Sequence, residues 1–170
     1  MSTPVTTHKT LLIVYHSSTG GAAQMAQAVQ AGAQQEPLVQ VRLLHATEAQ
    51  PQDVLAADGY VFVTPEYLAA MSGLMKDFFD RCYYPALERI QGRPYACLVC
   101  AGSDGSNAAR QIERIATGWR LKAVCDRVIV CTHAQTAEAI AAPKQIPTEE
   151  LNTCRELGAA LASGLQQGIF

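Results

Sequence analysis

The sequence has no apolar run long enough to cross a membrane. A transmembrane helix needs about 20 mostly apolar residues in succession, and no window of this 170-residue chain approaches that length. Residues 1–9 are polar and contain no apolar signal core. These absences argue against a membrane protein or a membrane partner, and they predict a cytoplasmic protein with a flexible N-terminal tail at residues 1–9.

A strong net charge is missing as well. The 13 Lys and Arg residues nearly balance the 15 Asp and Glu residues, which gives a formal net charge of -2. No basic stripe interleaved with aromatic residues occurs, which argues against nucleic acid as a partner. Because the chain is 49% hydrophobic and has the length of one typical domain, we expect residues 10–170 to form a single domain.

The motifs of several familiar sites are absent. The chain has no GxGxxG dinucleotide fingerprint, and no P-loop, because no lysine follows its Gly20-Gly21 pair. Its four histidines show neither i, i+4 spacing nor pairing with Cys or carboxylates, so no metal site is expected. No nucleophile with a base and an orienting group can be assembled. We therefore predict binding residues and no catalytic side chain.

A cysteine pair is present, although its setting argues against redox chemistry. Cys97 and Cys100 match CxxC, but they lie in a strand-like apolar run rather than at a helix start. Residues three apart in a strand point to opposite faces. Buried, reduced thiols are the better prediction.

One segment has the pattern of an anion site. The apolar run 11–15 is followed by Ser17-Ser18-Thr19-Gly20-Gly21, and a helix is expected to open at Ala22. Unpaired backbone N–H groups and the positive end of the helix dipole meet at such a junction, which favours a lone phosphate. His16 lies in the same loop, where its side chain could approach the anion or point outward.

A second segment lies at a similar strand end. Residues 58–63 read as a buried strand, and residues 64–73 (TPEYLAAMSG) follow before another helix. Tyr67 could lie against a bound ring or merely cover the end of the strand.

Together these segments resemble the flavodoxin-like FMN proteins, most closely the FMN-dependent NAD(P)H:quinone reductases related to the tryptophan-repressor-binding protein and similar to the NADPH-dependent FMN reductases. In that resemblance Tyr15-x-Ser17 with Gly20 is the phosphate loop, and residues 64–65 and 71–73 bracket the segment along the isoalloxazine ring. It implies FMN as cofactor, NADH or NADPH as co-substrate, and hydride transfer to the flavin and then to a quinone or similar small acceptor. It also implies a homodimer or homotetramer.

The residues expected to bind the cofactor lie in three loops at strand ends. The third loop, residues 102–107, is either another wall of the flavin pocket or an ordinary turn in which Ser106 caps the next helix. The expected binding residues are His16, Ser17, Ser18, Thr19, Gly20, Gly21, Ala22, Thr64, Pro65, Glu66, Tyr67, Leu68, Gly102, Ser103, Asp104 and Gly105.

Two other functions of the same fold are weighed against the enzyme. Electron-carrier flavodoxins usually have Thr where this chain has Ala22, and they are more acidic, so a flavodoxin-type carrier that docks on a redox protein is the alternative. A phosphorylation-controlled receiver would need Asp at the end of the third strand, where this chain has Thr64.

Strands and helices alternate along the chain, which predicts an α/β fold with a parallel sheet between helices. The expected arrangement is a flavodoxin-like three-layer sandwich with a five-stranded parallel sheet of order 2-1-3-4-5, in which the ligand lies at the switch point between strands 1 and 3. Segment 132–147 is long for a connection and could cover the pocket, pack in an oligomer or face solvent. The expected strands are 10–15, 38–44, 58–63, 95–101 and 121–131, and the expected helices are 22–35, about 51–56, 72–90, 106–117 and 148–167.

Overall fold

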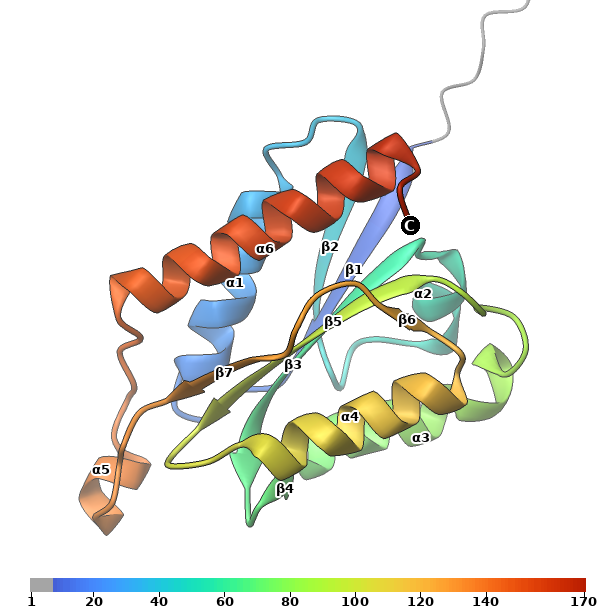
Figure 1. Cartoon of the computed structure of the whole chain (residues 1–170). Coiled ribbons are helices and arrows are strands. Elements are labelled where there is room, and N and C mark those ends of the chain that lie inside the picture. The colour runs from blue at the N-terminus through green and yellow to red at the C-terminus, as the bar shows by residue number, and fades with distance from the viewer. Residues whose placement is uncertain (1–7) are drawn as a thin grey trace, which may run out of the picture.

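The computed structural model describes residues 8–170 (Figure 1). The tail expected at residues 1–7 lies outside these residues, and Lys9, which we counted with the tail, is the first residue of β1. The elements are β1 (Lys9–Tyr15), α1 (Gly21–Ala33), β2 (Val39–His45), α2 (Pro51–Ala56), β3 (Gly59–Tyr67), β4 (Ala70–Met71), α3 (Gly73–Ala86), β5 (Pro94–Ala101), α4 (Ser106–Gly118), β6 (Lys122–Ala123), β7 (Val128–Cys131), α5 (Ala137–Ala141) and α6 (Thr148–Gln167).

The sheet has the predicted parallel order. Its strands run β2-β1-β3-β5-β6, and β7 continues beside β5 beyond β6. The expected fifth strand at 121–131 is therefore interrupted, and Arg127 in the interruption pairs with Glu113 of α4 at 2.9 Å. The flavodoxin-like fold class is confirmed.

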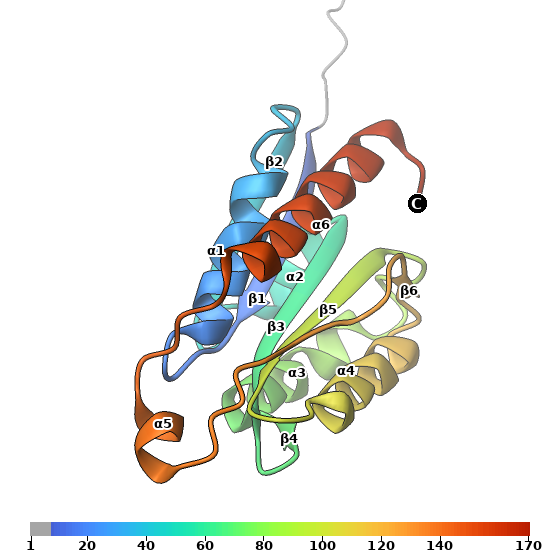
Figure 2. The same cartoon turned by 60° about the vertical axis from the view of Figure 1, so that its left-hand side comes forward.

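Two helical layers cover the sheet. Helices α1 and α6 lie side by side on one face, and α3 and α4 lie on the other with α2 (Figures 1 and 2). Each face has its own core: Phe78 belongs to the one under α3, and Met25 to the one under α1. Cys97 and Cys100 belong to different cores, as predicted for strand residues three apart, and all six cysteines are free.

Two element boundaries differ from the sequence expectation. Strand β3 does not end at Val63: its ladder to β5 continues through Pro65, which pairs with Cys100, and the chain then forms a hairpin with β4. A proline indicates a strand end because it cannot donate to the ladder, but here the pairing persists. Helix α3 ends at Ala86 rather than at residue 90, because the chain leaves the helical conformation at Leu87, with a ψ of 128°, and continues with a φ of 59° at Glu88.

The carboxyl ends of β1, β3, β5 and β7 meet at one edge of the sheet, opposite the C-terminus of the chain (Figure 1). Helix α5 lies at the same edge, near the start of α1 (Figure 2). No helix within residues 8–170 combines the length and apolar character needed to cross a bilayer.

Candidate functional site

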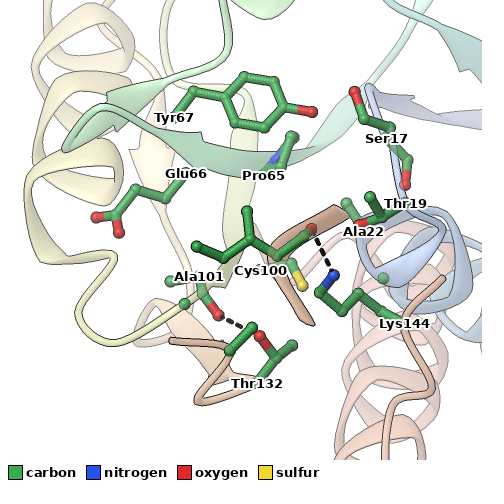
Figure 3. A pocket seen from close by; sticks show the side chains of 15 residues that line it. Ser17, Thr19, Ala22, Pro65, Glu66, Tyr67, Cys100, Ala101, Thr132 and Lys144 are labelled. Atoms are coloured by element: carbon green, nitrogen blue, oxygen red, sulfur yellow. Dashed lines mark hydrogen bonds between the residues drawn. The ribbon is translucent and has the colours of Figure 1, made fainter. Parts of the chain in front are cut away.

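A hollow opens at this edge of the sheet (Figure 3). Its enclosed volume is about 120 Å³, which is below the roughly 300–1,000 Å³ typical of small-molecule sites, so a larger ligand would extend from the hollow into solvent. It is lined by Ser17, Ser18, Thr19, Gly21, Ala22, Pro65, Glu66, Tyr67, Cys100, Ala101, Gly102, Thr132, Ala134, Ile140 and Lys144.

The loop at residues 17–22, where the sequence predicts a phosphate, forms one end of the hollow and is here called the phosphate end. Gly20 is the N-cap of α1 with a φ of 94°, a left-handed conformation that glycine adopts at little cost. Its N–H donates to Ser17 Oγ at 3.1 Å, which leaves the hydroxyl proton of Ser17 free to donate. Within residues 8–170 the N–H groups of Ser18 and Thr19 have no acceptor, and the first turn of α1 adds the unpaired N–H groups common to every helix start. These donors fit an anionic oxygen group.

The start of α1 lies close against β5. A Cβ atom on Gly21 would stand 2.6 Å from Cys100 Sγ, so a larger residue cannot occupy this position unless the Cys100 side chain or β5 moves. Ala22 is buried, with 1% of its surface exposed. Burial raises the pKa of the Cys100 thiol, and the thiol therefore lines the hollow in its protonated form.

Segment 132–147, here called the strap, closes the phosphate end. It leaves β7 with the Thr132 N–H donating to Ala101 O at 2.9 Å and returns to the phosphate loop, where the Lys144 N–H donates to Thr19 O at 2.7 Å. Gln24 of α1 binds the strap twice, because its amide donates to Lys144 O at 2.7 Å and accepts from the Ile146 N–H at 3.0 Å. The strap therefore covers the pocket, one of the three roles left open by the sequence.

The carboxyl end of β3, where the resemblance implies the flavin ring, forms the other end of the hollow and is here called the ring end. Glu66 lines it and accepts the Gly105 N–H at 2.7 Å, which ties β3 to the loop after β5. Tyr67 is 39% exposed and is the one aromatic residue among the lining residues. Leu68 and Ala69 follow in a two-residue hairpin loop and have φ values of 52° and 60°. The Leu68 side chain is fully exposed and lies outside the lining.

Several expected binding residues support the hollow rather than line it. Thr64 is fully buried, and its hydroxyl accepts the N–H of Ser72, the N-cap of α3, at 3.1 Å. Of the loop after β5 only Gly102 lines the hollow, and the N-cap of α4 is Gly105 instead of Ser106. The expected residues that do not line the hollow are His16, Gly20, Thr64, Leu68, Ser103, Asp104 and Gly105.

His16 points inward instead of approaching the anion or facing outward. Its side chain is 8% exposed, and its ring lies edge-on to the rings of His45 at 5.4 Å and Tyr67 at 6.0 Å. Its Nδ1 atom has no hydrogen-bond partner. Burial, and after it the neighbouring His45, lowers the pKa of His16 below its ordinary value.

Among the lining residues, the sequence reasoning missed Cys100 and Ala101, which it assigned only to a buried strand. It also missed Gln24 and the strap residues Thr132, Ala134, Ile140 and Lys144. They are not part of a local motif, because the strap reaches the phosphate loop across more than 100 residues of chain. The signal that pointed toward them was the unusual length of segment 132–147.

Comparison with known proteins assigns a family to this geometry. The sequence profile described as NADPH-dependent FMN reductase matches residues 43–135, which include the ring end but not the phosphate loop. Flavodoxin of Aquifex aeolicus is 31% identical over 89% of this chain and 84% of its own. The NAD(P)H dehydrogenase (quinone) of Acidithiobacillus ferrooxidans is 32% identical over 42% of this chain and 46% of its own.

A solved structure shows the same fold. The flavodoxin, WrbA-like protein from Agrobacterium tumefaciens superposes with a TM-score of 0.68 at 22% identity, covering 94% of this chain and 98% of that one. The unpaired N–H donors at the start of α1 suit the phosphate of an FMN cofactor. The chain thus belongs to the NADPH-dependent FMN reductase family and is a flavodoxin-like, FMN-dependent oxidoreductase that uses NAD(P)H.

Proposed function

We propose that the hollow binds FMN with its phosphate at residues 17–22 and its isoalloxazine ring beside residues 65–67, and that the enzyme reduces a quinone or similar small acceptor. The observation that carries this proposal is the juxtaposition of two features in one hollow. Unpaired N–H groups surround the start of α1, and an open wall of strand β3 faces them. The relative named NAD(P)H dehydrogenase (quinone) supports the choice of acceptor.

Bound FMN supplies the redox chemistry, since it can accept a hydride and release it to an acceptor. The protein supplies position. The phosphate-loop N–H groups and the Ser17 hydroxyl hold the anionic end, and Glu66 fixes the β3 wall through Gly105. No lining side chain forms a nucleophile and base pair, in keeping with a protein that binds and orients the reacting groups.

Tyr67 is the one lining aromatic, so at most one face of the ring lies against an aromatic side chain. The other face is left for the nicotinamide and the acceptor, which must then use it in turn. Ping-pong kinetics follow from this arrangement. We also propose that residues 10–170 act as one domain of a cytoplasmic protein that forms a homodimer or homotetramer. Sedimentation velocity would measure this oligomeric state.

The second candidate is a flavodoxin-type electron carrier. The observation that favours it is the match to the Aquifex protein named flavodoxin, which covers 89% of this chain. The formal net charge of -2 offers little electrostatic attraction for a redox partner, and the open Tyr67 wall suits a small acceptor better.

The test is anaerobic reduction of the FMN-loaded protein. NADH or NADPH should bleach the yellow colour, and a small quinone should restore it, with parallel lines in double-reciprocal plots at several quinone concentrations. If neither nicotinamide bleaches the bound flavin while a reduced redox protein does, the carrier replaces the enzyme. If the protein binds no FMN, both proposals fail.

A further inference from the structure

Lys144 is the one cationic side chain among the residues that line the hollow, and it has no acidic partner. The ion pairs formed among residues 8–170 do not include it. Its Nζ atom instead donates to three carbonyl oxygens at the end of α5, those of Ala139 and Ile140 at 2.8 Å and that of Ala142 at 2.6 Å. A positive charge is thus held at the pocket by neutral acceptors alone (Figure 3).

The base of this side chain lies at the phosphate end, and its charged Nζ atom lies at the end of α5. The backbone of Lys144 donates to Thr19, and its Cβ lies 3.4 Å from the place that a side chain on Gly21 would take. Glu66, the one lining carboxylate, stands on the opposite side of the hollow (Figure 3). The hollow therefore carries one positive charge on the side of the strap and one negative charge on the side of β3.

The phosphate loop itself carries no cation. Residues 16–24 contain no Lys or Arg, so the loop offers neutral hydroxyl and N–H donors and a helix dipole worth roughly half a charge. A phosphate monoester carries about -1.5 to -2 at pH 7. The N–H donors and the dipole can bind such a group, but they bring no full positive charge to it.

The strap holds Lys144 in place through Gln24. The same side-chain amide contacts Gly20 O at 3.0 Å, Lys144 O at 2.7 Å and the Ile146 N–H at 3.0 Å. The base of the lysine is therefore fixed to the phosphate loop, and its four-carbon side chain can turn between the carbonyl end of α5 and the hollow.

We propose that Lys144 supplies the positive charge of the phosphate subsite: its ammonium exchanges a carbonyl of α5 for a phosphate oxygen when a phosphorylated flavin enters. This inference rests on the proposed FMN site. It makes Lys144 a residue that favours FMN over riboflavin, in addition to the neutral donors of the phosphate loop.

The test compares FMN and riboflavin affinities, measured by quenching of flavin fluorescence, in wild type, Lys144→Met and Lys144→Arg. Lys144→Met keeps most of the apolar stem and should weaken FMN binding by about 5–10-fold, the value of a partly exposed charged hydrogen bond. Riboflavin affinity should stay within about twofold, because riboflavin has no phosphate. Lys144→Arg should recover most of the FMN affinity.

The matched control is Lys122→Met, which removes the same charge from β6, away from the hollow, and should leave both affinities unchanged. A pH series sharpens the result. Wild-type affinity for FMN should rise as pH increases through the second phosphate pKa of about 6, and the rise should be shallower in Lys144→Met.

Three outcomes overturn the inference. Equal losses of FMN and riboflavin in Lys144→Met would mean that the lysine only holds α5 together. Unchanged FMN affinity in that variant would mean that Lys144 does not contact the phosphate, and it would not contradict the proposed function. Failure of the wild-type protein to bind FMN would overturn both.

Discussion

The phosphate end and the ring end of the pocket both contain left-handed backbone, but different residue types adopt it. At the phosphate end the conformation falls on Gly20, with a φ of 94°. At the ring end it falls on Leu68 and Ala69, where each costs roughly 1–2 kcal/mol because the Cβ crowds the backbone. The loop of residues 17–22 places its left-handed backbone on a glycine, whereas the hairpin places it on residues with side chains and is strained.

The hairpin persists because α4 and the loop before it hold its base. Gln111 Oε1 accepts the Met71 N–H at 2.9 Å, and Asn107 Nδ2 donates to Ala69 O at 2.6 Å. Glu66 makes the third tie, to Gly105. Strain of this kind survives only where the surroundings specify the conformation, and these contacts supply that specification.

Gly20→Val should have the largest effect on FMN affinity, because it disturbs the backbone conformation of the phosphate loop. Valine cannot adopt a φ of 94° cheaply, so the N–H groups of the loop should lose their convergence. We expect FMN affinity to fall by at least about 100-fold, the loss of one or two charge-assisted hydrogen bonds, with a much smaller change for riboflavin. Fluorescence titration measures both. If Gly20→Val binds FMN normally while Gly102→Val does not, the phosphate loop lies elsewhere.

Ser17→Ala should have a smaller effect at the same end. The variant loses the Oγ atom that accepts the Gly20 N–H and a hydroxyl proton that can donate to phosphate. Neutral hydrogen bonds contribute about 0.5–1.5 kcal/mol each, so FMN affinity should fall by about 2–10-fold in an isothermal titration, with little change in the free energy of unfolding. An unchanged affinity would mean that the backbone N–H groups carry the phosphate site without this hydroxyl.

The two ends of the hollow also differ in how far they could be predicted from the sequence. The phosphate end is local: a strand, hydroxyls, glycines and a helix start follow one another within residues 11–22. The hairpin was missed because Leu68 and Ala69 are not residues that favour a turn with positive φ. Gln24 and Lys144 were missed because only the folded chain brings them together.

The fold was easier to predict than the site, because periodicity identifies buried strands and helices along most of the chain. The parallel order and α2 at residues 51–56 followed from that pattern. The break between β6 and β7 did not, since an edge strand can bend where a side chain such as Arg127 finds a partner on α4.

Replacing Leu68 with Asn and Ala69 with Gly should relieve the backbone strain of the hairpin, so that both ends of the hollow place positive φ values on residues that adopt them easily. Asn-Gly is the pair that this hairpin loop favours, and the Leu68 side chain has no packing to lose because it is fully exposed. The free energy of unfolding in urea should rise by about 1 kcal/mol, while FMN affinity should change by less than about twofold. Leu68→Ala is the control, since it keeps the strain and should leave stability unchanged. If the double variant is no more stable than wild type, the backbone of Leu68 and Ala69 is not strained, and strain does not distinguish the two ends of the hollow.

The last prediction concerns the pH dependence of stability at His16, which precedes the phosphate loop and whose ring lies against Tyr67 of the ring end. Its pKa in the folded protein is lowered by burial and by His45, so the unfolded chain binds a proton that the folded protein resists. The free energy of unfolding should therefore fall as pH drops below the ordinary histidine pKa of about 6.5, by at most about 1.4 kcal/mol per pH unit. Urea unfolding of wild type and His16→Leu between pH 7.5 and 5.5 measures this, and the variant should show the shallower fall. Parallel curves would mean that the folded protein protonates His16 as readily as the unfolded chain, and that the space between the two ends is open to water.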